Sequence, residues 1–329
     1  MLRYLVFRTL WAIPLLIAVS FMAFSLISWP PGDFVTSLVA RAAATGETVD
    51  PEMVAALRAR YGLDQSFLVQ YWKWISGIVV GDFGRSFEWS EPVSNLIWDR
   101  MGYTLLLTVL TLMFTWIVAL PIGIYSAVRQ YSIGDYIFST IGFLGIATPN
   151  FLLALIGLYI AVVHFGVDLS GFQSGQYLNA PWSWGRFVDL LNHLWLPVLV
   201  LGTAGTASLI KVMRANLLDE LRKPYVEAAR ARGLSEFSLI MKYPVRLAIN
   251  PFISTVGWIL PQLVSGSIVV SIVLSLPTAG PLLWQALQSQ DMYLAGAFIL
   301  LLSFMTIIGT LISDLLLAAI DPRIRYGNQ

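Results

Sequence analysis

Residues 103–128 read YTLLLTVLTLMFTWIVALPIGIYSAV, a run of 26 residues without a charged side chain. A helix rises about 1.5 Å per residue, so a run of this length crosses the roughly 30 Å of hydrocarbon in a bilayer. Lipid offers no hydrogen-bond partner to an open backbone. The run is therefore predicted to be a transmembrane α-helix.

Five further stretches have the same character and predict an all-α membrane protein with six transmembrane helices. Hydrophobic residues make up 57% of the chain and charged residues only 12%, against roughly 45–50% and about 25% in soluble domains. This composition excludes a soluble enzyme, a disordered chain and a fibrous repeat. The first span is longer than a signal-peptide core and is expected to stay as an anchor. The six predicted spans are about 10–28, 103–128, 136–163, 194–210, 249–276 and 293–320.

The residue types needed for catalysis or metal binding are scarce. The chain has no cysteine and two histidines, His164 and His193, too few for a supported metal cluster. It contains no Gly-x-x-x-x-Gly-Lys-Ser/Thr loop to hold ATP phosphates, and no basic stripe that would bind nucleic acid. We therefore assign no catalytic residue, no metal and no cofactor to this chain, and we expect that it is not an enzyme.

The distribution of Lys and Arg predicts the orientation. Eight of these residues lie in the segment 211–248, and an excess of Lys and Arg in short loops marks the cytoplasmic side. Six more lie in 29–102, but a loop of that length is translocated with little regard to charge. Both termini and 211–248 are thus predicted to be cytoplasmic, and 29–102 extracytoplasmic. Within the outer loop, helices are predicted at 51–61, with Asp50 as N-cap and Gly62 as the residue that ends the helix, and at 67–80. These helices either cover the span ends or form a docking surface for an outside partner.

The cytoplasmic loop carries the most informative pattern. Pro224 suits the first position of a helix, and Gly233 suits the left-handed residue that follows a helix end. A helix over 225–232 and a second one after Ser235 are therefore predicted to project from the membrane. A solvated basic loop is the simpler interpretation of the charges alone. Small side chains would let a partner approach closely, and the predicted small face consists of Ala228, Ala229 and Ala231.

Glu227-Ala228-Ala229 followed by Gly233 resembles the EAA signature of permease subunits in bacterial ATP-binding-cassette (ABC) importers. The eighteen-residue distance from Gly233 to Pro251 is similar to that of the dipeptide, oligopeptide and nickel group. The order of several other motifs agrees with the first permease of that group. These motifs are 61–65 (YGLDQ), 81–86 (GDFGRS), 148–151 (TPNF) and 321–327 (DPRIRYG).

The resemblance implies a type I ABC importer permease fold in the bacterial cytoplasmic (inner) membrane. It implies a coupling helix that contacts an ATPase through Tyr225, Glu227, Ala228, Ala229, Arg230 and Gly233. The implied partners are a homologous second permease, two cytoplasmic ATP-binding subunits that hold ATP and Mg, an extracytoplasmic solute-binding protein and membrane lipid. Oligopeptides are the expected cargo, oligosaccharides or glycosides are the alternative, and nickel ranks behind both. No residue of the substrate pathway is assigned.

Two other classes of function remain open at this point. A gradient-driven secondary carrier would show ionisable residues along its path, and Asp314 is the clearest residue of this kind in the spans. A structural membrane scaffold would explain the composition but not the Glu-Ala-Ala pattern. The outer segment between His164 and His193 matches no signature and has no assigned role.

Overall fold

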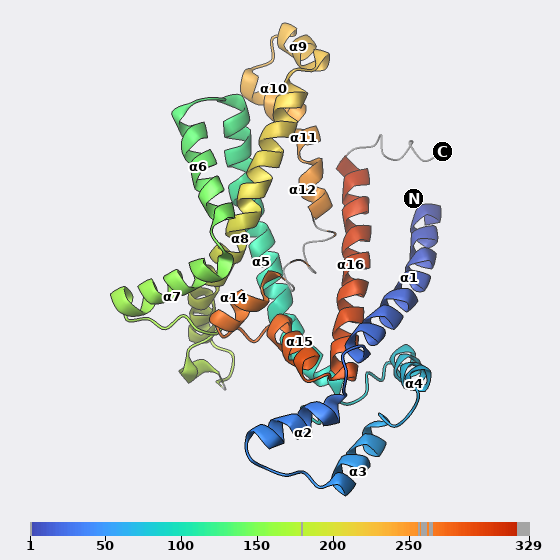
Figure 1. The fold of residues 1–329 in the computed structure, drawn as a ribbon. Coiled ribbons are helices and arrows are strands. Elements are labelled where there is room, and N and C mark those ends of the chain that lie inside the picture. Colours follow the sequence, from blue (N-terminus) through green and yellow to red (C-terminus); the bar gives the residue numbers. More distant parts are fainter. Residues whose placement is uncertain (1, 179, 256, 258–261, 263–265, 321–329) are drawn as a thin grey trace. The chain divides into compact units, whose positions relative to one another are not determined.

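The computed structural model describes residues 2–178, 180–255, 257, 262 and 266–320 (Figure 1). Apart from an isolated bridge between Arg85 and Pro92, the regular structure of these residues is helical. The chain divides into two compact units. The first unit comprises Met1–Thr104 and Thr278–Ile307, and the second comprises Leu105–Pro277 and Ile308–Gln329.

The first unit contains the predicted outer loop. The two helices expected in that loop are confirmed as α3 and α4, and α3 has the predicted N-cap at Asp50 and the left-handed C-cap at Gly62. A further helix, α2, was not predicted, although Asp33 caps it by accepting the N–H of Thr36 at 2.7 Å. The helices of this unit are α1 (Leu2–Ser28), α2 (Phe34–Ala44), α3 (Pro51–Tyr61), α4 (Phe67–Val79) and α15 (Ala279–Gln288), with parts of α5 (Val93–Val128) and α16 (Met292–Ile320).

Aromatic rings pack α4 against α1. The rings of Phe24 and Trp74 have centroids 5.4 Å apart, and Phe24 also packs at 5.6 Å from Tyr71. Ser20 shares a hydrogen bond of 2.8 Å with the hydroxyl of Tyr71. Phe24 and Trp74 are buried, so α4 rests on α1 through a buried aromatic contact.

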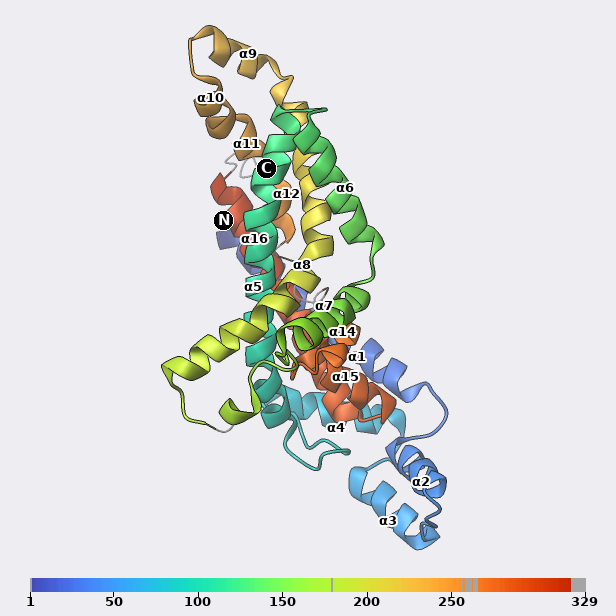
Figure 2. The same ribbon diagram turned by 90° about the vertical axis from the view of Figure 1, so that its left-hand side faces the viewer.

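The second unit is built around α8 (Trp184–Leu221). The helices α6 and α7 pack on α8, as Figures 1 and 2 show. Glycine permits this close packing, because a Cβ on Gly145 would lie 2.7 Å from the Cγ2 of Thr203. The other helices of this unit are α6 (Ile133–Ala147), α7 (Asn150–Phe165), α9 (Pro224–Ala231), α10 (Glu236–Lys242), α11 (Pro244–Ala248), α12 (Asn250–Thr255) and α14 (Ile268–Val273).

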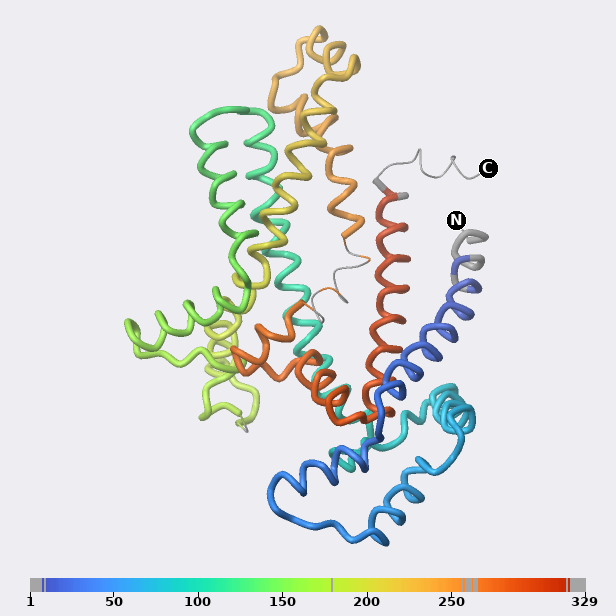
Figure 3. The backbone as a smooth tube through the Cα atoms, viewed as in Figure 1, coloured from blue at the N-terminus to red at the C-terminus, as the bar shows by residue number. Residues whose placement is uncertain are grey.

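Four described helices are long and apolar enough to cross a membrane, namely 10–28, 93–128, 184–221 and 292–317. The prediction of one continuous helix over 136–163 was wrong, because α6 and α7 meet at an angle of 100° (Figure 3). Pro149 has no N–H and forces the preceding Thr148 into an extended conformation, with ψ of 123°. If this bent pair is one span, the described residues contain five spans.

Other predicted boundaries also differ from the structure. The helix α5 begins ten residues before the predicted 103. The helix α8 begins ten residues before the predicted 194 and continues eleven residues past the predicted 210. The extension of α8 is explained by Met213 and Leu217, which are fully buried and continue its apolar face. The predicted span 249–276 contains α12 and α14, but most of its centre and the motif at 321–327 lie outside the described residues. Six spans and cytoplasmic termini therefore stay predictions.

Candidate functional site

The predicted cytoplasmic loop forms an ordered helical segment, residues 222–248, beyond the end of α8. Arg222 caps α8, Lys223 is extended, and Pro224 occupies the first turn of α9 as predicted. Glu220 holds the corner between the two helices. Its carboxylate accepts hydrogen bonds from the Nζ of Lys223 and the hydroxyl of Tyr225, both at 2.6 Å.

The helix α9 has one buried and one exposed face. Val226 is fully buried and Ala229 is 8% exposed, because residues three apart lie on the same side of a helix. Of the small face predicted from the sequence, Ala229 therefore lies on the buried side of α9. Ala228 and Ala231 are exposed, together with Glu227 and Arg230. Of the six residues predicted to face an ATPase, only Ala229 is buried, and Tyr225 is half-buried.

The turn after α9 is fixed by backbone and charge. Gly233 has the predicted left-handed conformation, with φ of +80°, and its N–H donates to the carbonyl of Arg230 at 3.0 Å. The guanidinium of Arg230 also pairs with Glu236 on α10, at 2.5 and 3.2 Å. This hydrogen-bonded ion pair raises the pKa of Arg230 and lowers the pKa of Glu236. The pair spans the turn and joins α9 to α10.

A continuous apolar cluster anchors this segment to the transmembrane helices. Met213 and Leu217 of α8 pack with Val226 of α9 and Leu239 of α10, all of them 0% exposed. The cluster also contains residues of α5, α11 and α12: Ala119, Ala127, Val245, Ala248 and Phe252. Displacing α9 would therefore move the ends of α5 and α8 with it, since packed cores deform little.

A partly buried ion pair ties α6 to α8. Asp135, 3% exposed, accepts a hydrogen bond from Nη2 of Arg214 at 3.1 Å and another from the backbone N–H of Tyr131 at 3.0 Å. The partner of Asp135 on α8 could not be inferred from the sequence. The pair connects two helices near the base of the 222–248 segment.

The two histidines do not form a metal site. Among the described residues no group of three or more His, Cys, Asp or Glu is arranged to hold a metal ion. His193 is buried, and its Nδ1 lies 2.8 Å from the carbonyl of Asp189. Asp189 in turn accepts hydrogen bonds from the N–H and the hydroxyl of Ser174. The outer segment without an assigned role is thus folded back onto the start of α8.

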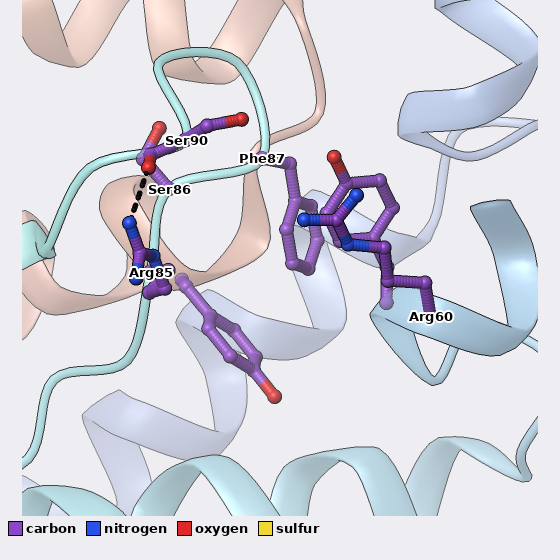
Figure 4. Close-up of a pocket in the computed structure, with 7 residues that line it drawn as sticks. Arg60, Arg85, Ser86, Phe87 and Ser90 are labelled. Carbon is purple, nitrogen blue, oxygen red and sulfur yellow. Dashed lines mark hydrogen bonds between the residues drawn. The ribbon is translucent and has the colours of Figure 1, made fainter.

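The first unit contains a cavity of about 380 Å³ that sequence reasoning missed (Figure 4). Arg60 lines it from the last turn of α3, and Arg85 lines it from a hairpin formed by residues 84–93. The hairpin is closed by two backbone hydrogen bonds, from Ser86 to Glu91 at 2.9 Å and from Val93 to Gly84 at 3.0 Å. The remaining lining residues are Tyr61, Ser86, Phe87, Ser90 and Tyr293.

Asp291 fixes this hairpin from below. The residue is 0% exposed, and its Oδ2 accepts hydrogen bonds from the hydroxyl of Ser86 at 2.5 Å and the N–H groups of Phe87 and Glu88 at 2.8 and 3.2 Å. Its Oδ1 accepts the N–H of Leu294 at 3.2 Å. Burial raises the pKa of this carboxyl, and the hydrogen bonds oppose that shift. Nothing in the sequence pairs Asp291 with a loop two hundred residues earlier.

Comparison with known proteins covers nearly the whole chain. Residues 119–326 match the family described as binding-protein-dependent transport system inner membrane component, and residues 1–108 match its N-terminal family. The oligopeptide transport system permease protein AppB of Bacillus subtilis is 34% identical, over 99% of this chain and 100% of that protein. A putative peptide permease of Brucella ovis is 37% identical over 99% of each chain. The glutathione transport system permease protein GsiC of Salmonella paratyphi A is 34% identical over 99% of this chain and 100% of its own.

Proposed function

The chain belongs to the family of inner membrane components of binding-protein-dependent transport systems, and from this premise we propose that it is a permease subunit of an ABC importer for oligopeptides. Relatives named as oligopeptide, peptide and glutathione permeases support this cargo class. Oligosaccharides are the alternative cargo. The chain would form half of the translocation pathway, beside a homologous second permease. ATP and Mg would be bound by two cytoplasmic ATPase subunits.

Coupling to an ATPase is supported by the way α9 packs, with one face exposed and the other in the apolar cluster. Its exposed face presents Glu227 together with Ala228 and Ala231, and the short side chains of the two alanines allow close approach by a partner. Its opposite face enters the apolar cluster through Val226 and Ala229. A rigid element with a small exposed face can transmit a displacement, because the cluster joins α9 to the transmembrane helices. ATP-driven closure of the partner ATPases would in this way move the inner ends of α5 and α8.

A matched pair of bulky substitutions tests this proposal. Ala228→Trp enlarges an exposed position on α9, and Ala43→Trp enlarges an exposed position on α2 in the other unit. Neither side chain is buried in the chain itself, so both variants are expected to fold. We expect Ala228→Trp to reduce ATP-dependent peptide uptake at least about tenfold, the effect of losing roughly 1.4 kcal/mol of interaction. Ala43→Trp is expected to retain uptake.

Two readouts separate coupling from assembly. Uptake of a labelled peptide into cells is measured at equal expression, and the ATPase subunits that copurify with the tagged permease are quantified. If Ala228→Trp transports peptide and retains its ATPases as the unmodified chain does, coupling through α9 is refuted. If uptake by the unmodified protein collapses with the ion gradient and needs no ATPase, the importer proposal itself is refuted in favour of a gradient-driven carrier.

A further inference from the structure

We propose that the cavity lined by Arg60 and Arg85 receives an acidic side chain of the extracytoplasmic solute-binding protein and so fixes where that protein docks. The inference rests on the proposed function and on the predicted extracytoplasmic position of residues 29–102. The cavity residues other than Tyr293 belong to the part of the chain that matches the N-terminal family, 1–108. The family is described as dependent on a binding protein, so a protein partner is expected on this side.

The charges of the cavity favour an anion. Arg60 and Arg85 are both exposed, and no carboxylate of the described residues forms an ion pair with either guanidinium. Arg85 donates one hydrogen bond, from Nη2 to the carbonyl of Ser90 at 2.8 Å. A guanidinium has five N–H donors in a planar fork that suits a carboxylate. The remaining donors of both arginines are therefore available to a ligand.

Three neighbouring acidic groups are already engaged, whereas Glu91 of the same hairpin is exposed. Glu88 accepts two hydrogen bonds of 2.7 Å from Arg41, and Asp291 lies buried beneath the hairpin. Asp82 accepts the N–H of Gly84 at 2.9 Å and acts electrostatically on Tyr293. An incoming carboxylate would thus meet the free donors of Arg60 or Arg85, which lie on opposite sides of Phe87 (Figure 4).

The walls of the cavity favour a protein side chain over a free peptide. Phe87 lies between two tyrosines, with ring centroids 4.7 Å from Tyr61 and 5.1 Å from Tyr293. Arginine beside aromatic rings is the combination that recurs at the centres of protein interfaces. The volume of about 380 Å³ is near the lower limit of ligand pockets, roughly 300–1,000 Å³. A cavity of this size accommodates one protein side chain and the residue next to it, and not an extended oligopeptide.

The site is also held in place before any partner arrives. Gly84 has a φ of +74°, and a Cβ there would lie 2.5 Å from the ring of Tyr293, so the start of the hairpin admits only glycine. Asp291 then fixes the next turn through Ser86 and Phe87. A rigid site loses little conformational entropy when it binds. The backbone that carries Arg85 is therefore held in one arrangement before a partner binds.

The test uses the intact complex of both permeases and their ATPases in nanodiscs of zwitterionic lipid, with its purified binding protein as the probe. The variants are Arg60→Gln, Arg85→Gln and their combination. Lys73→Gln is the matched control, because Lys73 is exposed in the same unit but does not line the cavity. Binding is measured at 50 and 300 mM NaCl.

We expect each arginine variant to weaken binding of the binding protein about five- to tenfold at low salt, and the control to change it by less than about twofold. The difference should shrink at high salt, because exposed charge pairs are screened. Each Asp or Glu on the binding protein is then neutralised in turn. Neutralising one of these carboxylates should weaken binding, and its loss of binding free energy should not add to the loss caused by Arg85→Gln. Such non-additivity is expected when the two groups contact each other.

Three results would overturn the inference. The first is unchanged binding by the double arginine variant, and the second is strict additivity for every carboxylate. In the third, the double arginine variant binds the binding protein normally but binds vesicles that contain phosphatidylglycerol more weakly than the unmodified complex does. That result would assign the cavity to a lipid headgroup. Peptide uptake by the unmodified complex is measured in parallel. Its absence would refute the proposed function, whereas normal uptake with any of these results would refute only the docking site.

Discussion

Replacing Asp291 with asparagine is expected to open the hairpin of residues 84–93 while the rest of the chain stays folded. Four hydrogen bonds converge on this buried carboxylate, three on Oδ2 and one on Oδ1. All four donors point at oxygen atoms. Asparagine keeps one oxygen and replaces the other with an NH₂ group, which donates and does not accept.

The magnitude follows from the donors that asparagine cannot satisfy. In its better orientation the amide oxygen takes the place of Oδ2, and the NH₂ group faces the N–H of Leu294. A buried donor left without an acceptor costs about 1–3 kcal/mol. When the hairpin opens, the amide can turn its oxygen toward Leu294, so the penalty applies to the closed hairpin alone. A penalty of about 2 kcal/mol then raises the population of the open hairpin roughly thirtyfold.

Limited proteolysis measures that population. Trypsin cleaves after Arg85 inside the hairpin, and the rate tracks the open fraction when opening is fast compared with cleavage. In the purified full-length chain, Asp291→Asn should be cleaved at Arg85 roughly thirtyfold faster, while cleavage after the exposed Arg222 in the other unit stays unchanged. Asp50→Asn is the control, because it removes the same charge at an exposed N-cap that asparagine also satisfies. Equal cleavage at Arg85 in Asp291→Asn and the unmodified chain would refute the role of Asp291.

Further predictions concern packing, the ion pair between Asp135 and Arg214, and pH. Gly123→Ala should lower the free energy of unfolding by about 1–3 kcal/mol, because the new Cβ would lie 2.6 Å from a side chain of α8. Gly102→Ala in the same helix is the control, since its Cβ would meet nothing within 4 Å. Thermal unfolding that does not distinguish the two variants would contradict this reasoning. Asp135→Asn and Arg214→Gln should each lower the melting temperature, and the double variant should lose less than the sum, since the two groups contact each other at 3.1 Å. Burial alone would raise the pKa of Asp33, but its hydrogen bonds outweigh burial and hold the pKa below 3.8. The stability from this cap is therefore present above pH 3.8 and lost as the pH falls through the lower folded pKa; Asp33→Asn should abolish that part of the acid dependence of helicity, measured by circular dichroism.

The sequence by itself determined where helices begin and end in much of the chain. Caps and breakers act within a few residues, so Asp50 and Gly62 bound α3, and Pro224 and Gly233 bound α9, as the pattern predicts. The apolar runs determined that the protein crosses a membrane, because lipid requires satisfied backbone groups. The Glu-Ala-Ala pattern indicated the family in the same local way.

Tertiary structure alone decided how these elements face one another. A proline at 149 predicts an interruption or a kink, but the angle of 100° between α6 and α7 depends on how both helices pack on α8. Ala229 is buried and Ala228 exposed because the cluster lies on one side of α9, which the sequence of that loop does not reveal. The contact between Asp291 and the hairpin of residues 84–93 joins segments two hundred residues apart. Such a contact depends on the folding of the chain between them, so no local pattern of residues encodes it.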